Sequence, residues 1–576
     1  IAGLVFFFLI LGGIIGAFSD FGPEPLALKE KTILHMQLKG TILEKADTEL
    51  DPTTFTISES IGLPDILYGL SKAKEDNMIK GLFIDISDVD CGMATAREIR
   101  NALKDFQKSG KFVVAYNSGE YISQKAYYIS SAAKEAFGFP TSAFQLTGLG
   151  GEMMYYKGML DKLDLEVEII RGKNNDFKSA VEPFFLTGLS DSARLQNQVL
   201  MNGIWNELAA DISASRNIKT SEFNGWINNM EVVNPNQALA HKLVDGLLYK
   251  DEMMAKLSKK VGLSNNDKIK WAEFNEYAQN AFYESQVLIQ AESASVAVIL
   301  AEGEVAVDGN GVSSKKLCHL FEKVRNDDDI KAVVFRINSP GGSALASEEI
   351  WREVMLTQKK KKVYVSMGDV AASGGYYIAC KSNKIFAQAN TITGSIGVFG
   401  ILFNMQELFE NKIGVHFDGV NTNKHSDFAA ADRKMTEQEK AIIAAEIANV
   451  YELFKQRVAE GRKISVAMAD SLGRGRVWSG TDALRIGLID AIGGLDDAIA
   501  WAAKEAKLSA YHITNFPKQE FQWKDLLKGI SSVEINSAIE KNPELKGNYN
   551  AIMKLLYQMQ SMKGIQTRLP GEIIID

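Results

Sequence analysis

The strongest constraint on this chain is an internal repeat. The run IKGLFIDIS begins at Ile79 and the run IKAVVFRINS at Ile330, and both are typical of buried strands rich in Ile, Val and Phe. A Tyr-Tyr-Ile sequence follows each run, first at Tyr127 and again at Tyr376, 249 positions later. Repetition on this scale predicts two domains of common ancestry that fold alike.

Strand and helix patterns alternate within each copy. In the first copy a helical pattern over 94–106 precedes a short apolar strand over 112–116, and in the second copy the equivalents are 344–356 and 363–367. Connections long enough to hold a helix favour parallel strands, so the sequence predicts an α/β fold. The expected parts are an α/β domain over 30–255, a helical linker over 256–289, a second α/β domain over 290–515 and a helical extension over 516–576.

The amino-terminal residues predict a membrane anchor. Residues 1–18 carry no charge and include an apolar block at 6–11. A helix of that length reaches about 27 Å, close to the thickness of the hydrocarbon core of a bilayer. A cleaved signal peptide is the alternative, but the sequence that follows, Gly16-Ala17-Phe18-Ser19-Asp20, is not a convincing small-x-small cleavage site. We therefore expect an uncleaved span over 1–18, with the rest of the chain on one side of the membrane.

Composition excludes several kinds of site. A net charge of −8 and an isoelectric point of about 5.6 leave no basic excess for a nucleic-acid partner. The three cysteines, Cys91, Cys318 and Cys380, are odd in number and far apart, so they predict neither a disulfide framework nor a zinc site. None of the six histidines has the i, i+4 spacing of a zinc protease.

Two glycine-rich segments of the second copy have the composition of a reactive site. NSPGGS, from Asn338, follows a strand, and its glycines permit a tight turn whose N–H groups approach a ligand, although such a sequence is usually only a turn. Ser373 lies among small residues in GDVAASGGY, which is typical of a nucleophile at a sharp strand-to-helix turn. A serine that caps a helix over 374–381 is the alternative. Ala371 departs from the G-x-S-x-G motif.

The residues alone leave the base for such a serine open. A third segment, TITGSIGVFG from Thr391, is rich in glycine and hydroxyl groups but contains no histidine. His416 and His425 could reach the serine by folding. A desolvated lysine is the other option, because burial can leave its amine neutral near pH 7. The chain has many lysines, and their spacing does not choose one.

The order and spacing of these motifs resemble the signal peptide peptidase A family, also called protease IV. The motifs are NSPGGS, MGDVAASGGYYIA and TITGSIGVFG in the second copy. The first copy adds DFKSAVEPF, from Asp176, which is similar to the family segment that carries a catalytic lysine. The resemblance covers nearly the whole chain, including the anchor and the doubled, long form. It implies two tandem Clp protease/crotonase-like α/β spirals and a Ser–Lys dyad.

The resemblance also implies a role for each matching residue. Ser373 is the expected nucleophile, Lys178 the general base, and Ser395 the hydroxyl that orients the lysine amine. The expected oxyanion hole consists of the N–H group of Gly374 and that of Gly341 or Gly342.

The repeat supports a single site shared by the two copies. The position 249 residues before Ser373 is Gln124, so the first copy lacks the serine turn. Aligning Asp176 on Asp427 places Ala429 opposite Lys178, so the second copy lacks the lysine. Each copy therefore keeps one member of the dyad. Drift after duplication, with one copy purely structural, is the alternative.

The function implied by the resemblance is a membrane-anchored serine endopeptidase that degrades cleaved signal peptides and other short apolar segments. It implies a single-pass protein of the bacterial inner membrane with its catalytic body on the periplasmic side. Peptides are the expected partners, together with further copies of the chain in a homo-oligomer, a tetramer by resemblance. No metal or organic cofactor is implied. A crotonase-like acyl-CoA enzyme and a catalytically dead membrane scaffold are the alternatives.

Overall fold

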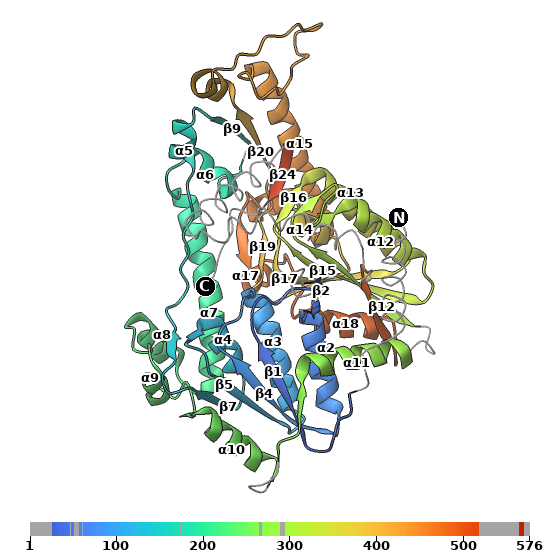
Figure 1. Cartoon of the computed structure of the whole chain (residues 1–576). Helices are drawn as coiled ribbons and strands as arrows, with labels where there is room; N and C mark the ends of the chain where they lie inside the picture. Colours follow the sequence, from blue (N-terminus) through green and yellow to red (C-terminus); the bar gives the residue numbers. More distant parts are fainter. Residues whose placement is uncertain are drawn as a thin grey trace, which may run out of the picture.

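The computed structural model describes residues 26–45, 48–50, 57–59, 61–172, 174–263, 268–288, 294–517 and 564–568. The expected anchor over 1–18 lies outside these residues. No helix in the described part of the chain is long and apolar enough to cross a membrane. Figure 1 shows the first copy of the repeat, coloured blue to green, packed against the second copy, coloured yellow-green to red-orange.

The first copy is built on a six-stranded parallel sheet ordered β10-β7-β5-β4-β1-β11. On its central strand β4, Leu82 and Phe83, which face opposite sides, are both buried, as expected for a parallel sheet covered by helices. The strands are β1 (Thr32–Leu38), β4 (Ile79–Ile86), β5 (Phe112–Asn117), β7 (Glu135–Gly138), β10 (Gly246–Leu247) and β11 (Trp271–Glu273). The helices of this copy are α2 (Leu63–Glu75), α3 (Met93–Gln107), α4 (Gln124–Ser130), α5 (Lys157–Lys162), α6 (Glu182–Phe185), α7 (Asp191–Arg216), α8 (Thr220–Asn228), α9 (Pro235–Ala240), α10 (Lys250–Lys260) and α11 (Phe274–Leu288).

The second copy repeats this arrangement. Its sheet follows the order β21-β19-β17-β15-β12-β23, with β18 beside β17 and β22 beside β18. The strands are β12 (Ser295–Glu302), β15 (Ile330–Ser339), β17 (Lys362–Ala372), β18 (Lys384–Ala387), β19 (Ile392–Gly394), β21 (Val477–Ser479), β22 (Ala491–Ile492) and β23 (His512–Phe516). The helices are α12 (Ser314–Asn326), α13 (Ala344–Gln358), α14 (Gly374–Ala379), α15 (Glu437–Arg462), α16 (Val466–Leu472), α17 (Gly480–Arg485) and α18 (Leu495–Glu505). The α/β class is thus confirmed, with two domains on parallel sheets.

The duplication extends to single hydrogen bonds. The Tyr127 hydroxyl donates to Leu243 O at 2.7 Å, and the Tyr376 hydroxyl donates to Leu488 O at 2.8 Å. The long helices α7 and α15 each span 26 residues and end on a left-handed residue. Equivalent side chains therefore hold equivalent parts of the two copies.

A third sheet joins the two copies, in the order β14-β13-β16-β24-β20-β9. Strand β9 (Glu166–Arg171) comes from the first copy and pairs antiparallel with β20 (Phe399–Asn404) of the second. Strand β24 (Gly564–Arg568) lies between β16 (Gly341–Ser343) and β20 and is antiparallel to both. The sheet also contains β13 (Val305–Ala306) and β14 (Val312–Ser313), and two short pairs lie elsewhere, β2 (Thr48–Leu50) with β3 (Ile57–Glu59) and β6 (Tyr121–Ser123) with β8 (Ala143–Gln145).

Two expected boundaries differ from the structure. The stretch expected as a linker over 256–289 contains β11, which pairs with β1, and α11, which packs on α2, so this stretch belongs largely to the first domain. The apolar side chains of Ala272, Phe274 and Ala278 drive this docking, since all three are buried. Most of the expected helical extension over 516–576 lies outside the described residues. Its described parts are the end of β23 at Phe516, the next residue, and the strand 564–568.

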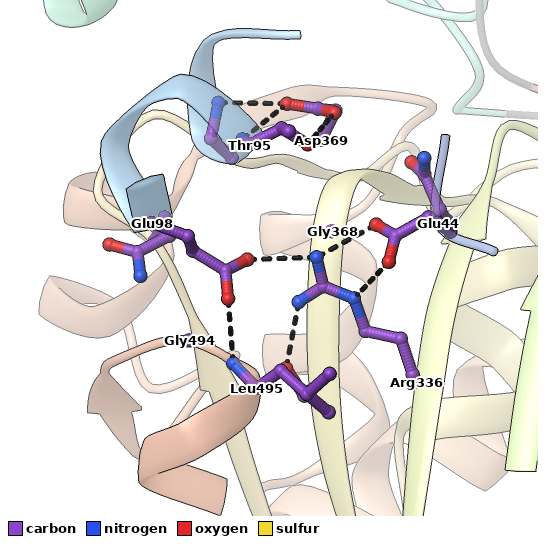
Figure 2. Close-up of polar contacts among 12 residues, drawn as sticks. Glu44, Thr95, Glu98, Arg336, Gly368, Asp369, Gly494 and Leu495 are labelled. Atoms are coloured by element: carbon purple, nitrogen blue, oxygen red, sulfur yellow. Dashed lines mark hydrogen bonds and ion pairs between the residues drawn. The ribbon is translucent and has the colours of Figure 1, made fainter. Parts of the chain in front are cut away.

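A buried polar cluster fixes one copy on the other (Figure 2). The Arg336 guanidinium of β15 lies 2.7 Å from Glu44 Oε1 and 2.8 Å from Glu98 Oε1, both from the first copy. Beside it, Asp369 on β17 accepts hydrogen bonds from the backbone N–H and the hydroxyl of Thr95 at the start of α3, at 2.9 and 2.6 Å. These contacts fix the position of β17 relative to the first copy.

We predict that Arg336→Met lowers the free energy of unfolding by about 3–5 kcal/mol, because it leaves two carboxylates buried without a counter-ion. Urea unfolding followed by circular dichroism measures the change. Lys219→Met is the control, since its ion pair with Glu222 is largely exposed and should matter little. Equal stability of the two variants would contradict a structural role for the cluster.

Candidate active site

Ser373 is the residue between strand β17 and helix α14. Its φ of +54° lies in the left-handed region, where a non-glycine residue is strained. The backbone is held on both sides, since Ser373 N–H donates to Gly394 O at 2.8 Å and Tyr377 N–H donates to Ser373 O at 2.8 Å. Ser373 occupies the N-cap position of α14, yet its side chain makes no capping hydrogen bond. The capping alternative therefore does not account for its hydroxyl.

The Lys178 amine reaches this hydroxyl from the first copy of the repeat. Lys178 Nζ lies 2.9 Å from Ser373 Oγ, 2.9 Å from Ser395 Oγ and 3.1 Å from Ser395 O. All three residues are 0% exposed. Because the partner oxygens are neutral and water is excluded, burial lowers the pKa of Lys178 well below its ordinary value of 10.5. A neutral amine at this distance can accept the serine proton.

The segment before Lys178 is docked on the second copy. Asn175 Nδ2 donates to Val398 O at 2.6 Å, three residues before the lysine. Gly475 has a φ of +77°, and a β-carbon there would lie 2.5 Å from Lys178 N, so glycine is required for this approach. The sequence patterns do not predict Asn175 or Gly475 as site residues. The Gly-Arg-Gly run that ends at Gly475 is the local signal that could have done so.

Ser395 is positioned by a strained turn of its own. Its φ is +49°, and its N–H donates to Arg476 O at 2.7 Å. The turn directs both its carbonyl and its hydroxyl at the Lys178 amine. Two hydrogen bonds from one residue restrict the rotation of that amine.

The glycine turns lie against the backbone of the residue after the serine. A β-carbon on Gly341 would be 2.6 Å from Gly374 N, so the two turns touch. Gly341 has a φ of +96°, and its N–H donates to Ser339 Oγ at 3.2 Å. A β-carbon on Gly342 would be 2.1 Å from Val305 O. Backbone packing of this kind leaves no room for side chains beside Ser373.

Strand β24 crosses these glycines. Its register pairs Thr567 with Gly342 and Arg568 with Gly341. The Thr567 hydroxyl donates to Gly342 O at 3.0 Å, and a β-carbon on Gly374 would lie 2.8 Å from that hydroxyl. An extended peptide backbone therefore fits between β16 and β20, beside the serine. A cavity of about 720 Å³ adjoins it, lined by residues that include Val305, Leu345 and Gln566.

Other candidate residues are placed elsewhere. His416 is exposed, and His425 Nδ1 lies 3.2 Å from Glu439 Oε1. Gln124, the counterpart of Ser373, exchanges hydrogen bonds with the backbone of Gly148, and Ala429, the counterpart of Lys178, is exposed. Within the residues described, no group of three or more His, Cys, Asp or Glu side chains could hold a metal ion.

Comparison with known proteins identifies the family. The model of "Peptidase family S49" matches residues 105–264 and 355–509, one region in each copy of the repeat and together more than half of the chain. The chain belongs to peptidase family S49. The family resemblance stated from the motifs is thereby confirmed, and the chain is a serine peptidase of this family.

Curated relatives match this S49 chain over most of its length. "Protease 4" of Salmonella typhi is 33% identical over 89% of this chain and 84% of its own length. "Serine protease SPPA, chloroplastic" of Arabidopsis thaliana is 30% identical over 94% of this chain and 78% of its own length. A solved structure of a ClpP1 mutant from Listeria monocytogenes covers 38% of this chain and 99% of its own, at 18% identity, with a TM-score of 0.25. That score is too low to establish a common fold.

We predict that burial of Lys178 makes the stability of the S49 chain depend on pH. The unfolded chain binds a proton at this amine up to about pH 10.4, whereas the folded chain has lost it above the lowered pKa. Between these two values the unfolded state binds more protons, so stability rises with pH, by about 1.4 kcal/mol per unit.

The Lys178→Met variant lacks the titrating amine, so its stability does not carry this dependence on pH. It should be more stable than the wild type at pH 8, and the difference should be smaller at pH 9. Urea unfolding of both proteins at each pH measures the difference. A difference that is constant with pH would contradict a lowered pKa.

Proposed function

We propose that this S49 peptidase cleaves peptide bonds with Ser373 as nucleophile and Lys178 as general base. The observation that carries the proposal is the 2.9 Å contact between Lys178 Nζ and Ser373 Oγ in a fully buried setting. Neutral Lys178 takes the hydroxyl proton while Ser373 Oγ attacks the carbonyl carbon of the substrate. The lysine ammonium then protonates the leaving amine. Water, deprotonated by the same lysine, hydrolyses the acyl-enzyme.

Backbone N–H groups would stabilise the tetrahedral intermediate. Gly374 N–H follows the nucleophile, and Gly341 or Gly342 supplies the second donor of the oxyanion hole. The contact between the Gly341 and Gly374 turns supports this assignment. Ser395 acts by orienting the lysine amine, which its two hydrogen bonds support.

The substrate would bind as an extended strand between β16 and β20. The place of β24 supports this mode, because an antiparallel strand there passes directly beside Ser373. Main-chain pairing accepts many sequences, which suits short, apolar, unfolded peptides such as cleaved signal peptides. The names of the relatives support the peptidase, and the apolar cavity beside β24 supports the apolar substrate.

We further propose a membrane-anchored, oligomeric setting for the enzyme. Each copy of the repeat is a Clp protease/crotonase-like spiral, and residues 1–18 anchor the chain in the bacterial inner membrane with the catalytic body on the periplasmic side. The chain acts as a homo-oligomer, a tetramer by its resemblance to the family. An acyl-CoA enzyme or an inactive scaffold would not need a buried lysine aimed at a serine, so the dyad geometry favours the peptidase.

We predict that Ser373→Ala and Lys178→Arg each reduce kcat/KM for a fluorogenic apolar peptide by roughly 10⁴-fold or more. Alanine removes the nucleophile. Arginine keeps the positive charge, but its guanidinium stays protonated and cannot accept the serine proton.

Ser130→Ala is the matched control, because this serine is also fully buried but lies on α4, with its hydroxyl bonded to Tyr127 O. It should retain activity. Substantial turnover by Lys178→Arg would show that the site needs charge and not basicity, which would exclude the Ser–Lys mechanism.

We predict that a chain ending at residue 563 has a lower KM and an unchanged kcat. Substrate must displace β24 from the site, so it binds only those molecules in which β24 has left. The measured KM is therefore the KM of the open site divided by the fraction of molecules that are open. Without β24 every molecule is open, so KM should fall to the value of the open site. Steady-state kinetics measure this change. A chain ending at residue 568 keeps β24 and is the control. If both truncated chains behave like the full chain, β24 does not compete with substrate.

A further inference from the structure

One carboxylate beside the candidate site has its counter-charge on β24. Glu304, just before β13, accepts a hydrogen bond at 3.2 Å between its Oε1 and Nη1 of Arg568. Each of these side chains is only 16% exposed, and Arg568 is the ion-pair partner of Glu304 among the described residues. Burial raises the pKa of the Glu304 carboxyl, and the charge of Arg568 lowers it in part. An anion at this depth therefore favours a cation beside it.

The strand register places the two charges in line. Val305 of β13 pairs with Gly342 of β16, so Glu304 is level with Gly341. Gly341 pairs in turn with Arg568 on the far side of β16, and glycine contributes no side chain between the two charges. The Glu304 carbonyl also accepts a hydrogen bond from the N–H group of Val312 at 2.9 Å. The carboxylate therefore belongs to the sheet itself, and only its partner belongs to β24.

The cavity beside β24 suits a long cationic side chain. Glu304 lines it together with apolar residues such as Val305 and Leu345. Gln566, which also lines it, is two residues from Arg568, so both lie on one face of β24. The alkyl part of a lysine or arginine can pack on the apolar wall while its charge reaches Glu304.

The other two carboxylates of this cavity have partners outside β24. Glu348 Oε1 lies 2.5 Å from Arg457 Nη2, and Asp308 Oδ2 lies 3.7 Å from Lys315 Nζ. No lysine or arginine is among the described residues that line the cavity. Of the three carboxylates, Glu304 is thus the one that loses its counter-charge when substrate displaces β24.

We propose that Glu304 is a specificity-determining residue that binds one lysine or arginine side chain of the substrate, at the place that Arg568 occupies in β24. The substrate is then an apolar peptide with a basic residue at a fixed distance from the bond that is cut. Cleaved signal peptides have this chemistry, because a positively charged segment precedes their apolar core. The inference rests on the proposed function, since it concerns side chains of the peptide that Ser373 would attack.

A lysine scan tests the preference on the full-length chain. An internally quenched peptide of alanine and leucine carries either lysine or uncharged norleucine at each position in turn, and mass spectrometry locates each cut. We expect lysine to raise kcat/KM by roughly 10-fold or more, the order for one charge-assisted hydrogen bond. Every lysine peptide should be cut at the same distance from its lysine. General attraction of cationic peptides to an acidic chain would raise the rates without fixing that distance.

Glu304→Gln tests the residue, because it keeps the shape of the side chain and removes its charge. The advantage of lysine over norleucine should disappear, and the cut should no longer follow the lysine. The ratio of the two kcat/KM values is unaffected by competition from β24, which acts on both peptides equally. Glu304→Lys should reverse the preference in favour of a glutamate peptide. Asp308→Asn removes another charge from the same cavity and should keep the wild-type ratio.

The outcomes separate this inference from the mechanism. Cutting that ignores the lysine, or a lysine preference that survives Glu304→Gln, would overturn the inference and leave the Ser–Lys proposal intact. Turnover that persists in Ser373→Ala, or no turnover of any of these peptides by the unchanged chain, would overturn both.

Discussion

A lysine amine buried against a serine hydroxyl is the interaction on which the rest of this molecule depends. The pKa of the amine stays low only while both copies of the repeat exclude water from it, since desolvation is the cause of the shift. The two copies must therefore stay docked in one closely defined arrangement. The ion pairs of Arg336, the contacts of Asp369 with α3 and the hydrogen bond of Asn175 to the second copy all serve this docking.

Duplication explains how one site came to be divided. Both copies keep the framework bonds, such as those of Tyr127 and Tyr376, because each sheet needs them to pack. The candidate site residues, by contrast, do not have to be kept in both copies. Gln124 now bonds the backbone of Gly148, and the segment around Ala429 is exposed. Each copy retains the half of the proposed dyad that meets the other copy.

Antiparallel strand addition recurs in this fold. It joins the copies through β9 and β20, and it holds β24 beside Ser373. Pairing of backbone groups requires little from the sequence, so one geometry can join the copies and, in the proposed binding mode, hold the substrate. The strained turns at Ser373 and Ser395 confine the reactive groups to one edge of this sheet.

The sequence by itself determined the repeat, the α/β class, most strands and helices, and the turn at Ser373, because these follow from local patterns of apolar and small residues. It did not select Lys178 among many lysines without the family resemblance, and it missed Asn175, Gly475 and the docking of 271–288 on the first domain. Lys178 and Ser373 are 195 residues apart, and the basicity of the amine is set by burial that both copies supply. Only the tertiary structure decides which amine loses its water, because desolvation is a property of the surroundings and not of the residue.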